Sequence, residues 1–406
     1  PIQRNGEIYT LTGNIASNCR GIVIDRDNTK LNGAGFALQG SGNSREIQTG
    51  VDLSYRINVT IENMVISGFY YGVVLNYSMS NSVSGNNITK NGYGISVGFS
   101  WNNNISGNSI TSNGLFADPY SVGSGIYLFL YSSSNTISGN NIAANRGVGI
   151  RFWNSFVNSI FGNNITNSNS GIFLYSSDYN SISGNHIIDN GYGVSLGHSR
   201  NNSIYGNNIT ANTDHGILLE FSANNNVSGN NIADNKGSDP PANGVGLWYA
   251  SNSNSISGNN ITANQNYGIG LDSSSNNDIF GNNIADNKLA IYLGSSSGNR
   301  FYHNNIMNKT NNQILSYYSP NDWDDGASGN YWSDYLLRYA NASEIDSTGI
   351  GDTAYVIDAN NTDRYPLMNP YVIPEFQSLL APSLFMVSTL LIAIVYRRKY
   401  LAFARA

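Results

Sequence analysis

Apolar and polar residues alternate along most of this chain in very short stretches. Between residues 81 and 307, segments such as Asn104-Ile105-Ser106 and Ser109-Ile110-Thr111 place one apolar residue between two polar ones. A period of two is typical of β-strands. Gly and Asn stand between the segments, and both residues readily adopt the backbone conformations that tight turns need. The pattern predicts many short strands joined by turns.

A nine-residue unit of the form N-S-I-S-G-N-N-I-T recurs from residue 81 to residue 307. Its central glycines are 22 or 23 residues apart, except for two longer spacings of 32 and 29. A fixed period of this length indicates a solenoid. Each unit offers three strands and three turns, which make one coil. We therefore predict an all-β fold, a right-handed single-stranded parallel β-helix with three strands per coil of about 22 residues.

An asparagine follows each central glycine and should occupy the same place in every coil. Side-chain amides stacked in register can hydrogen-bond from one coil to the next. We expect this ladder to stabilise a turn rather than to bind a ligand. Its members are Asn86, Asn108, Asn140, Asn163, Asn185, Asn207, Asn230, Asn259, Asn282 and Asn304.

The period divides the chain into regions. We expect an N-terminal cap with degenerate coils over residues 1–80, regular coils over 81–310, and a C-terminal cap over 311–368. The second cap is rich in aspartate, which either binds calcium or serves in surface turns.

The end of the chain has the pattern of a membrane anchor. After a linker at 369–375, residues 376–396 carry no charge, and as a helix they would span about 31 Å. The basic residues of 397–406 follow at once, which favours a cytoplasmic tail. We predict one C-terminal transmembrane helix and a cell-surface protein whose N-terminal domain is extracellular.

Composition excludes several classes of protein. The 66 Asn, 53 Ser and 43 Gly argue against a helical bundle. The net charge of −6, without a basic stripe in the body of the chain, argues against a nucleic-acid partner. One cysteine allows no intrachain disulfide, and four scattered histidines with five methionines give little material for a metal site. We expect no metal and no cofactor.

The coil pattern resembles the NosD-like right-handed parallel β-helix family, with its carbohydrate-binding and sugar-hydrolysis repeats. Segments 329–335, 349–355 and 363–368 resemble the C-terminal signature of that family, and the tail from Pro374 resembles archaeal surface-protein anchors. The resemblance implies the fold and a surface location. The namesake is implicated in copper delivery to a periplasmic reductase, but this sequence lacks clusters of His, Cys and Met, so we do not expect copper as a partner.

The outward residues of the three strands distinguish three faces. The third face, after the central Gly-Asn pair, carries mainly Thr and Ala, and the second face carries mainly Ser. On the first face we predict binding of a polysaccharide or cell-envelope glycan, because sugar rings stack on aromatic side chains. The predicted ligand-binding residues are Tyr127, Phe129, Arg151, Trp153, Phe173, Tyr175, Trp248 and Tyr292.

Three alternatives to glycan binding by the first face remain open. Glu220 and Asp272 hold equivalent positions two coils apart and are tentative catalytic residues of a polysaccharide hydrolase or lyase, with Asp214 and His215 in the turn before Glu220. In the second alternative, the aromatics form a small core beneath the insertions at 114–124 and 237–243, which enter the first face. The third alternative is a purely structural envelope or adhesion protein that packs through its flat third face. Binding without catalysis is the function we favour.

Overall fold

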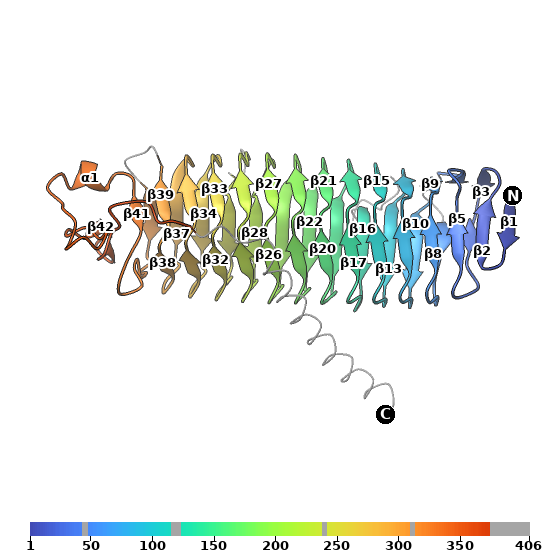
Figure 1. Cartoon of the computed structure of the whole chain (residues 1–406), viewed down its shortest axis with the longest axis horizontal. Helices are drawn as coiled ribbons and strands as arrows, with labels where there is room; N and C mark the ends of the chain where they lie inside the picture. Colours follow the sequence, from blue (N-terminus) through green and yellow to red (C-terminus); the bar gives the residue numbers. More distant parts are fainter. Residues whose placement is uncertain (43–47, 115–122, 238–241, 309–312, 374–406) are drawn as a thin grey trace, which may run out of the picture.

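Successive coils stack along one axis, so that each strand pairs in parallel with its equivalent in the next coil (Figure 1). The structure is a computed structural model, and it describes residues 1–42, 48–114, 123–237, 242–308 and 313–373. Within these residues the strands form a right-handed β-helix with three long sheets. The predicted parallel β-helix with three strands per coil is confirmed for these residues.

The first sheet, whose outer side is the first face, has 13 strands in the described residues. They are β4 (Ile22–Val23), β7 (Thr49–Asp52), β10 (Tyr71–Asn76), β13 (Tyr93–Gly98), β16 (Ser124–Phe129), β19 (Val148–Trp153), β22 (Ser170–Tyr175), β25 (Tyr192–Gly197), β28 (Ile217–Glu220), β31 (Val245–Trp248), β34 (Tyr267–Asp272), β37 (Leu289–Gly294) and β40 (Ile314–Tyr317).

The second sheet has 14 described strands, and its first pair, β1 and β2, is antiparallel. Its strands are β1 (Ile2–Asn5), β2 (Ile8–Leu11), β5 (Lys30–Asn32), β8 (Thr60–Glu62), β11 (Ser82–Ser84), β14 (Asn104–Ser106), β17 (Thr136–Ser138), β20 (Ser159–Phe161), β23 (Ser181–Ser183), β26 (Ser203–Tyr205), β29 (Asn226–Ser228), β32 (Ser255–Ser257), β35 (Asp278–Phe280) and β38 (Arg300–Tyr302).

The third sheet also has 14 described strands. They are β3 (Ile15–Ser17), β6 (Ala37–Gly40), β9 (Val65–Ser67), β12 (Asn87–Thr89), β15 (Ser109–Thr111), β18 (Asn141–Ala143), β21 (Asn164–Thr166), β24 (His186–Ile188), β27 (Asn208–Thr210), β30 (Asn231–Ala233), β33 (Asn260–Thr262), β36 (Asn283–Ala285), β39 (Asn305–Met307) and β41 (Tyr331–Trp332).

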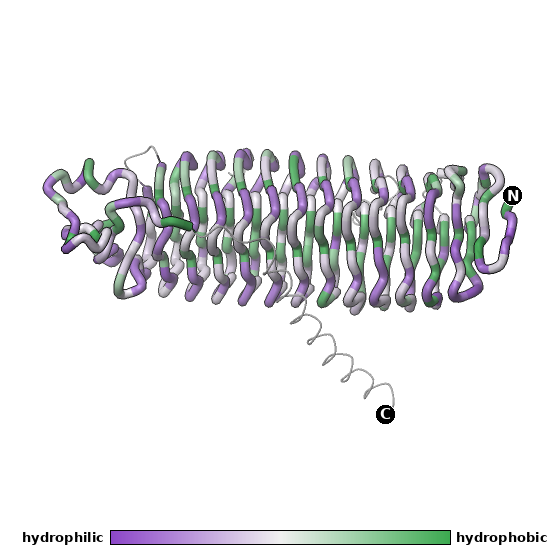
Figure 2. Tube along the Cα trace, viewed as in Figure 1, coloured by the Kyte–Doolittle hydropathy of each residue, from purple (hydrophilic) through white to green (hydrophobic). Residues whose placement is uncertain are grey.

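The core consists of columns of aliphatic side chains inside the solenoid. Ile105, Ile137 and Ile160 stand in register on the second sheet and are fully buried. Figure 2 shows hydrophobic residues recurring from coil to coil along the solenoid. Each coil covers the apolar residues of its neighbours, so no single coil is a stable unit.

The predicted asparagine ladder is present and is buried. The Nδ2 group of Asn86 donates to Oδ1 of Asn108 at 3.1 Å, and the bonds continue beyond Asn304 to Asn330. Two further asparagine ladders pass through Asn103 and Asn113 at the other turns. These bonds pair buried polar groups that would otherwise destabilise the interior.

A column of glycines leads into the first sheet and sets how closely the coils approach. A Cβ atom on Gly149 would lie 2.6 Å from the carbonyl oxygen of Gly171 in the next coil and 2.8 Å from Cγ2 of Ile165. No side chain fits there without moving the backbone. Glycine is therefore required at this position for steric reasons.

The far end of the solenoid is closed by aromatic residues. Trp323, Trp332 and Tyr355 are buried there, and the Trp332 and Tyr355 rings stack at 4.0 Å. A short helix, α1 (Tyr335–Arg338), and the antiparallel pair β42 (Tyr355–Asp358) and β43 (Asn361–Asp363) complete this region. They cover the last coil (Figure 1).

The predicted transmembrane segment, 376–396, and the basic tail lie outside the described residues. In the part of the chain that the structure describes, no helix is long and apolar enough to cross a membrane.

Candidate functional site

The strand register brings the predicted site residues into two neighbouring columns on the first face. One column runs Tyr127, Arg151, Phe173 in consecutive coils, and the adjacent column runs Phe129, Trp153, Tyr175. The second column continues through Gly197 to Glu220, Trp248 and Asp272. The first column continues through Ser195, Leu218, Gly246 and Gly270 to Tyr292.

The N-terminal half of these columns is an aromatic cluster, made of Tyr127, Phe129, Trp153, Phe173 and Tyr175 around Arg151. The Tyr127 and Phe129 rings stack at 5.0 Å, and the Trp153 and Tyr175 rings stack at 4.5 Å. Between them, the Arg151 guanidinium lies 5.2 Å from the Tyr127 ring and 5.4 Å from the Trp153 ring. Aromatic rings attract a cation at such distances.

The C-terminal half carries the carboxylates. Glu220 and Asp272 stand on either side of Trp248, two ladder steps apart, which is about 9.6 Å along the axis. Burial raises the pKa of Glu220, although nearby His198 opposes the shift. A carboxyl with a raised pKa is suited to act as a general acid.

A partly buried polar cluster, made of Tyr192, Asp214 and the fully buried His215, lies beside Trp248. The His215 ring is fully buried, meets Trp248 edge-on at 4.6 Å, and accepts a hydrogen bond at Nδ1 from the Asn243 backbone N–H at 2.9 Å. Its Nε2 atom is 3.6 Å from Oδ1 of Asp214. Burial lowers the pKa of His215 to about 4, so the ring is neutral at neutral pH. Its contacts with Trp248 and with the Asn243 backbone help to orient Trp248 and the start of β31.

Tyr192 belongs to the same cluster but stands one coil earlier, at the start of β25. Burial raises the pKa of its hydroxyl to about 12, and the Asp214 carboxylate adds to this shift. The sequence placed Asp214 and His215 near Glu220 but did not single out Tyr192. Only the stacking of coils reveals that neighbour.

A second row of aromatics, which the sequence analysis missed, follows the edge of the first face. Tyr77, Phe99, Phe221 and Tyr249 each come directly after a strand of the first sheet, with φ between 48° and 53°. The Tyr77 and Phe99 rings stack at 4.7 Å, and the Phe221 and Tyr249 rings stack at 5.4 Å. Bulky residues rarely adopt this left-handed conformation. An aromatic residue directly after a first-sheet strand was the available signal, although other coils have Leu130, Asn154 or Ser176 at this position.

All ten predicted site residues are half-buried. They are therefore neither fully exposed platforms nor a fully buried core. Most of each insertion, residues 115–122 and 238–241, lies outside the described residues. Tyr292 stands apart from the aromatic cluster, because its ring contacts are with Tyr267 at 4.7 Å and Tyr317 at 6.3 Å.

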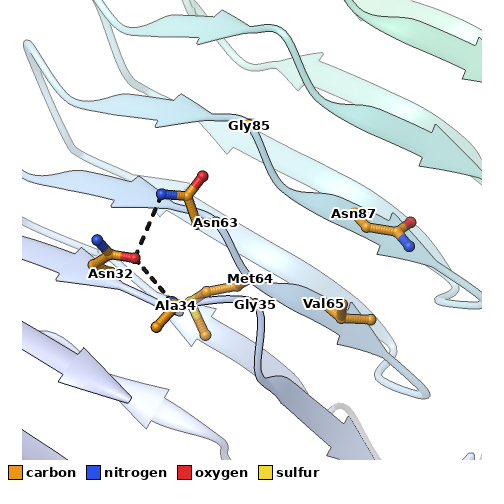
Figure 3. A pocket seen from close by; sticks show the side chains of 8 residues that line it. All are labelled: Asn32, Ala34, Gly35, Asn63, Met64, Val65, Gly85 and Asn87. Carbon is orange, nitrogen blue, oxygen red and sulfur yellow. Dashed lines mark hydrogen bonds between the residues drawn. The ribbon is translucent and has the colours of Figure 1, made fainter. Parts of the chain in front are cut away.

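A shallow pocket near the N-terminus lies away from the first face, at the turns between the second and third sheets (Figure 3). There, the Asn32 side chain accepts hydrogen bonds from the Ala34 backbone and from Asn63. The lining contains no acidic, basic or histidine side chain, so it offers little chemistry. Its residues are Asn32, Ala34, Gly35, Asn63, Met64, Val65, Gly85 and Asn87.

Metal-ligating side chains are dispersed. Across the described ranges, no three His, Cys, Asp or Glu residues come together as a possible metal site. Several aspartates of the C-terminal cap are already engaged. Asp324 pairs with Arg364 at 2.6 Å, Asp352 accepts from the Ser343 hydroxyl, and Asp358 accepts from Asn361.

The fold is similar to that of several solved structures at low identity. One mutant of the periplasmic alginate epimerase AlgG is 18% identical, with a TM-score of 0.38; the match covers 67% of this chain and 63% of that one. The DFA-IIIase of Arthrobacter chlorophenolicus A6 in complex with GF2 is 15% identical, with a TM-score of 0.48 and coverage of 74% and 84%. The mannuronan C-5 epimerase AlgE4 A-module of Azotobacter vinelandii is 16% identical, with a TM-score of 0.46. That match covers 70% of this chain and 78% of the module.

No curated protein matches this sequence. A family model does match it, in three overlapping segments at residues 2–127, 118–215 and 207–337. Its description is "periplasmic copper-binding protein (NosD)", and the matched segments cover nearly all the coils and the start of the C-terminal cap. The resemblance of the repeat to NosD is thus confirmed, and the chain belongs to the NosD family.

Proposed function

We propose that the first face binds a polysaccharide chain lengthwise. The observation that carries this proposal is the run of half-buried aromatic side chains in register over consecutive coils, from Tyr127 to Tyr175. A repeating ligand fits a repeating surface. Sugar rings present an apolar side that packs on aromatic rings and hydroxyls that hydrogen-bond to polar neighbours.

The third face lacks this character. On the third face, Thr111, Ala143 and Thr166 stand in register and form a column of small side chains. Such a surface is flat and offers no ring for stacking. A flat surface suits lateral packing between molecules. If no glycan binds, a structural envelope or adhesion role would therefore be favoured.

Cleavage of the bound glycan is a second candidate function, favoured by Glu220 and Asp272 on either side of Trp248. Their backbone positions are about 9.6 Å apart along the axis, just beyond the ~6.5–9.5 Å found between the carboxyl groups of inverting glycosidases. We expect Glu220→Gln to abolish any cleavage while glycan retention persists, as judged by mass spectrometry of the products. Cleavage that persists in the variant would remove Glu220 from a catalytic role.

We do not extend copper binding to this chain from the family description. Copper sites use clustered thiolate, thioether and imidazole ligands. In the described residues the lone Cys19 is exposed at one end, whereas His198 and His215 face aromatic rings on separate coils. This donor set does not fit a copper ion.

Anchoring at the cell surface is also a proposal, and it rests on the sequence of 376–396. A chain ending at residue 373 should be released from membranes, whereas the full chain should sediment with them and resist carbonate extraction. Equal behaviour of the two chains would contradict the anchor.

The proposed binding is tested with the double variant Trp153→Ala/Trp248→Ala in the full chain. Because each tryptophan supplies a large apolar surface, we expect retention in polysaccharide-containing gels to fall at least tenfold. The matched control is Phe161→Ala/Phe280→Ala, which removes two aromatics from the second face. Unchanged retention of the first-face variant, with its circular dichroism intact, would refute the proposal.

A further inference from the structure

Arg151 is surrounded by aromatic residues and is the only basic residue in the described strands of the first sheet. Tyr127 and Phe173 precede and follow it in its own column, and Trp153 is its neighbour in the adjacent one. Every flanking position of the two columns is aromatic, so the cation sits among apolar rings in the centre of the proposed glycan surface.

The guanidinium has no oxygen partner in the part of the chain that the structure describes. Its Nε atom is buried without a hydrogen-bond acceptor, although a guanidinium carries five N–H donors. The rings of Tyr127 and Trp153 attract the positive charge, but they leave these donors unpaired. An arginine held in this way is ready to bind an anion.

Arg300 shows how the same fold treats a comparable arginine on the second face. It also lies over an aromatic ring, Tyr302 at 5.2 Å, but it forms an ion pair with Asp278 at 3.6 Å. Lys30, in β5, pairs with Glu62 at 2.7 Å. Of Arg151, Arg300 and Lys30, Arg151 is the one that has no carboxylate partner.

The electrostatic setting favours an external anion at this position. The nearest carboxylate of the second column, Glu220, follows Trp153 by three ladder steps, or about 14 Å along the axis. That separation exceeds the screening length of about 8 Å at physiological salt. Surrounding rings exclude water and strengthen a charge-assisted hydrogen bond, and the guanidinium fork can bind two oxygens at once.

We propose that Arg151 is the anion subsite of the first face, and that the glycan bound there is acidic. Its N–H donors would hold an oxyanion substituent, a carboxylate or a sulfate, of a sugar whose ring stacks on the neighbouring aromatics. This inference rests on the proposed glycan binding and specifies its ligand class.

The test compares the full chain with Arg151→Met in affinity electrophoresis against polygalacturonate, dextran sulfate and neutral dextran. We expect the parent to bind at least one acidic polymer tenfold or more tightly than dextran, with an affinity that falls as salt rises. Arg151→Met should lose this preference and its salt dependence, and Arg151→Lys should retain part of the preference. The polymer whose binding is lost identifies the carboxylate or the sulfate as the substituent.

Arg300→Met is the matched control, since it removes an arginine over a ring from the second face and should leave the preference unchanged. A preference that survives in Arg151→Met, or a parent that binds acidic and neutral polymers equally, would overturn the anion subsite alone. A parent that binds none of a broad polysaccharide panel would overturn the proposed function itself. Equal thermal unfolding of the variants and the parent confirms that folding is not the cause.

Discussion

The first and third faces are built on the same coils and share the same interior, yet their outer surfaces differ. Inside, buried isoleucines and asparagine ladders recur through the regular coils. Outside, the third face repeats small residues, whereas the first face gathers rings, one unpaired arginine and two carboxylates. The comparison teaches that the fold is specified by inward positions, which leaves outward positions free to carry a ligand site.

The strongest test of this division sets an inward residue against an outward one in the same coil. The Asn163 side chain accepts from Asn140 and donates to Asn185 and to the Ile137 carbonyl. Asn163→Leu leaves these buried groups unpaired, at about 1–3 kcal/mol each, so we expect several kcal/mol of destabilisation. Guanidinium unfolding followed by circular dichroism measures it.

The control for this prediction is Thr166→Ala on the third face, three residues after Asn163, where we expect a change within about 0.5 kcal/mol. If both variants unfold at the same denaturant concentration, the ladder does not specify the fold.

A second test uses His215, the fully buried member of the partly buried polar cluster. The pKa of His215 is about 4 in the folded chain, below its ordinary value of 6.5, because the ring is buried. Between these values the unfolded chain binds a proton that the folded chain does not. Stability should therefore be lost as pH falls from about 6.5 to about 4, and His215→Asn should lessen that loss.

The measurement is the unfolding midpoint of the parent and of the variant at each pH in this range. The difference between the two midpoints should change as pH falls. His186→Asn, which changes an exposed histidine on the third face, should follow the parent. A His215→Asn profile that matches the parent at every pH would show that this ring does not titrate on unfolding.

The smallest effect is expected at the aromatic edge of the first face. Tyr249 is exposed and stacks on Phe221, so Tyr249→Ala should scarcely affect stability. If the edge contributes to glycan binding, its loss should weaken binding by about 0.5–1.5 kcal/mol, the value of one aromatic pair, or about two- to twelvefold. Tyr205→Ala on the second face is the comparison, and equal binding by both variants would limit the site to the two columns.

The sequence by itself determined the coil, the register and the identity of the three faces. Alternation with a period of two decides which side chains point inward, and a nearly constant coil length then aligns them, as in the ladder from Asn86 to Asn304. It also predicted correctly that Arg151 and Trp153 share a face with Glu220 and Trp248.

Only the tertiary structure decided which of these side chains meet. The contact of His215 with Trp248, the position of Tyr192 one coil earlier and the isolation of Arg151 depend on side-chain packing across coils. So does the row of rings in left-handed turns after the first sheet. A one-dimensional repeat fixes where each residue stands along the coil, but the partner of a charge or a ring is chosen in three dimensions, by the neighbours that stacking brings within reach.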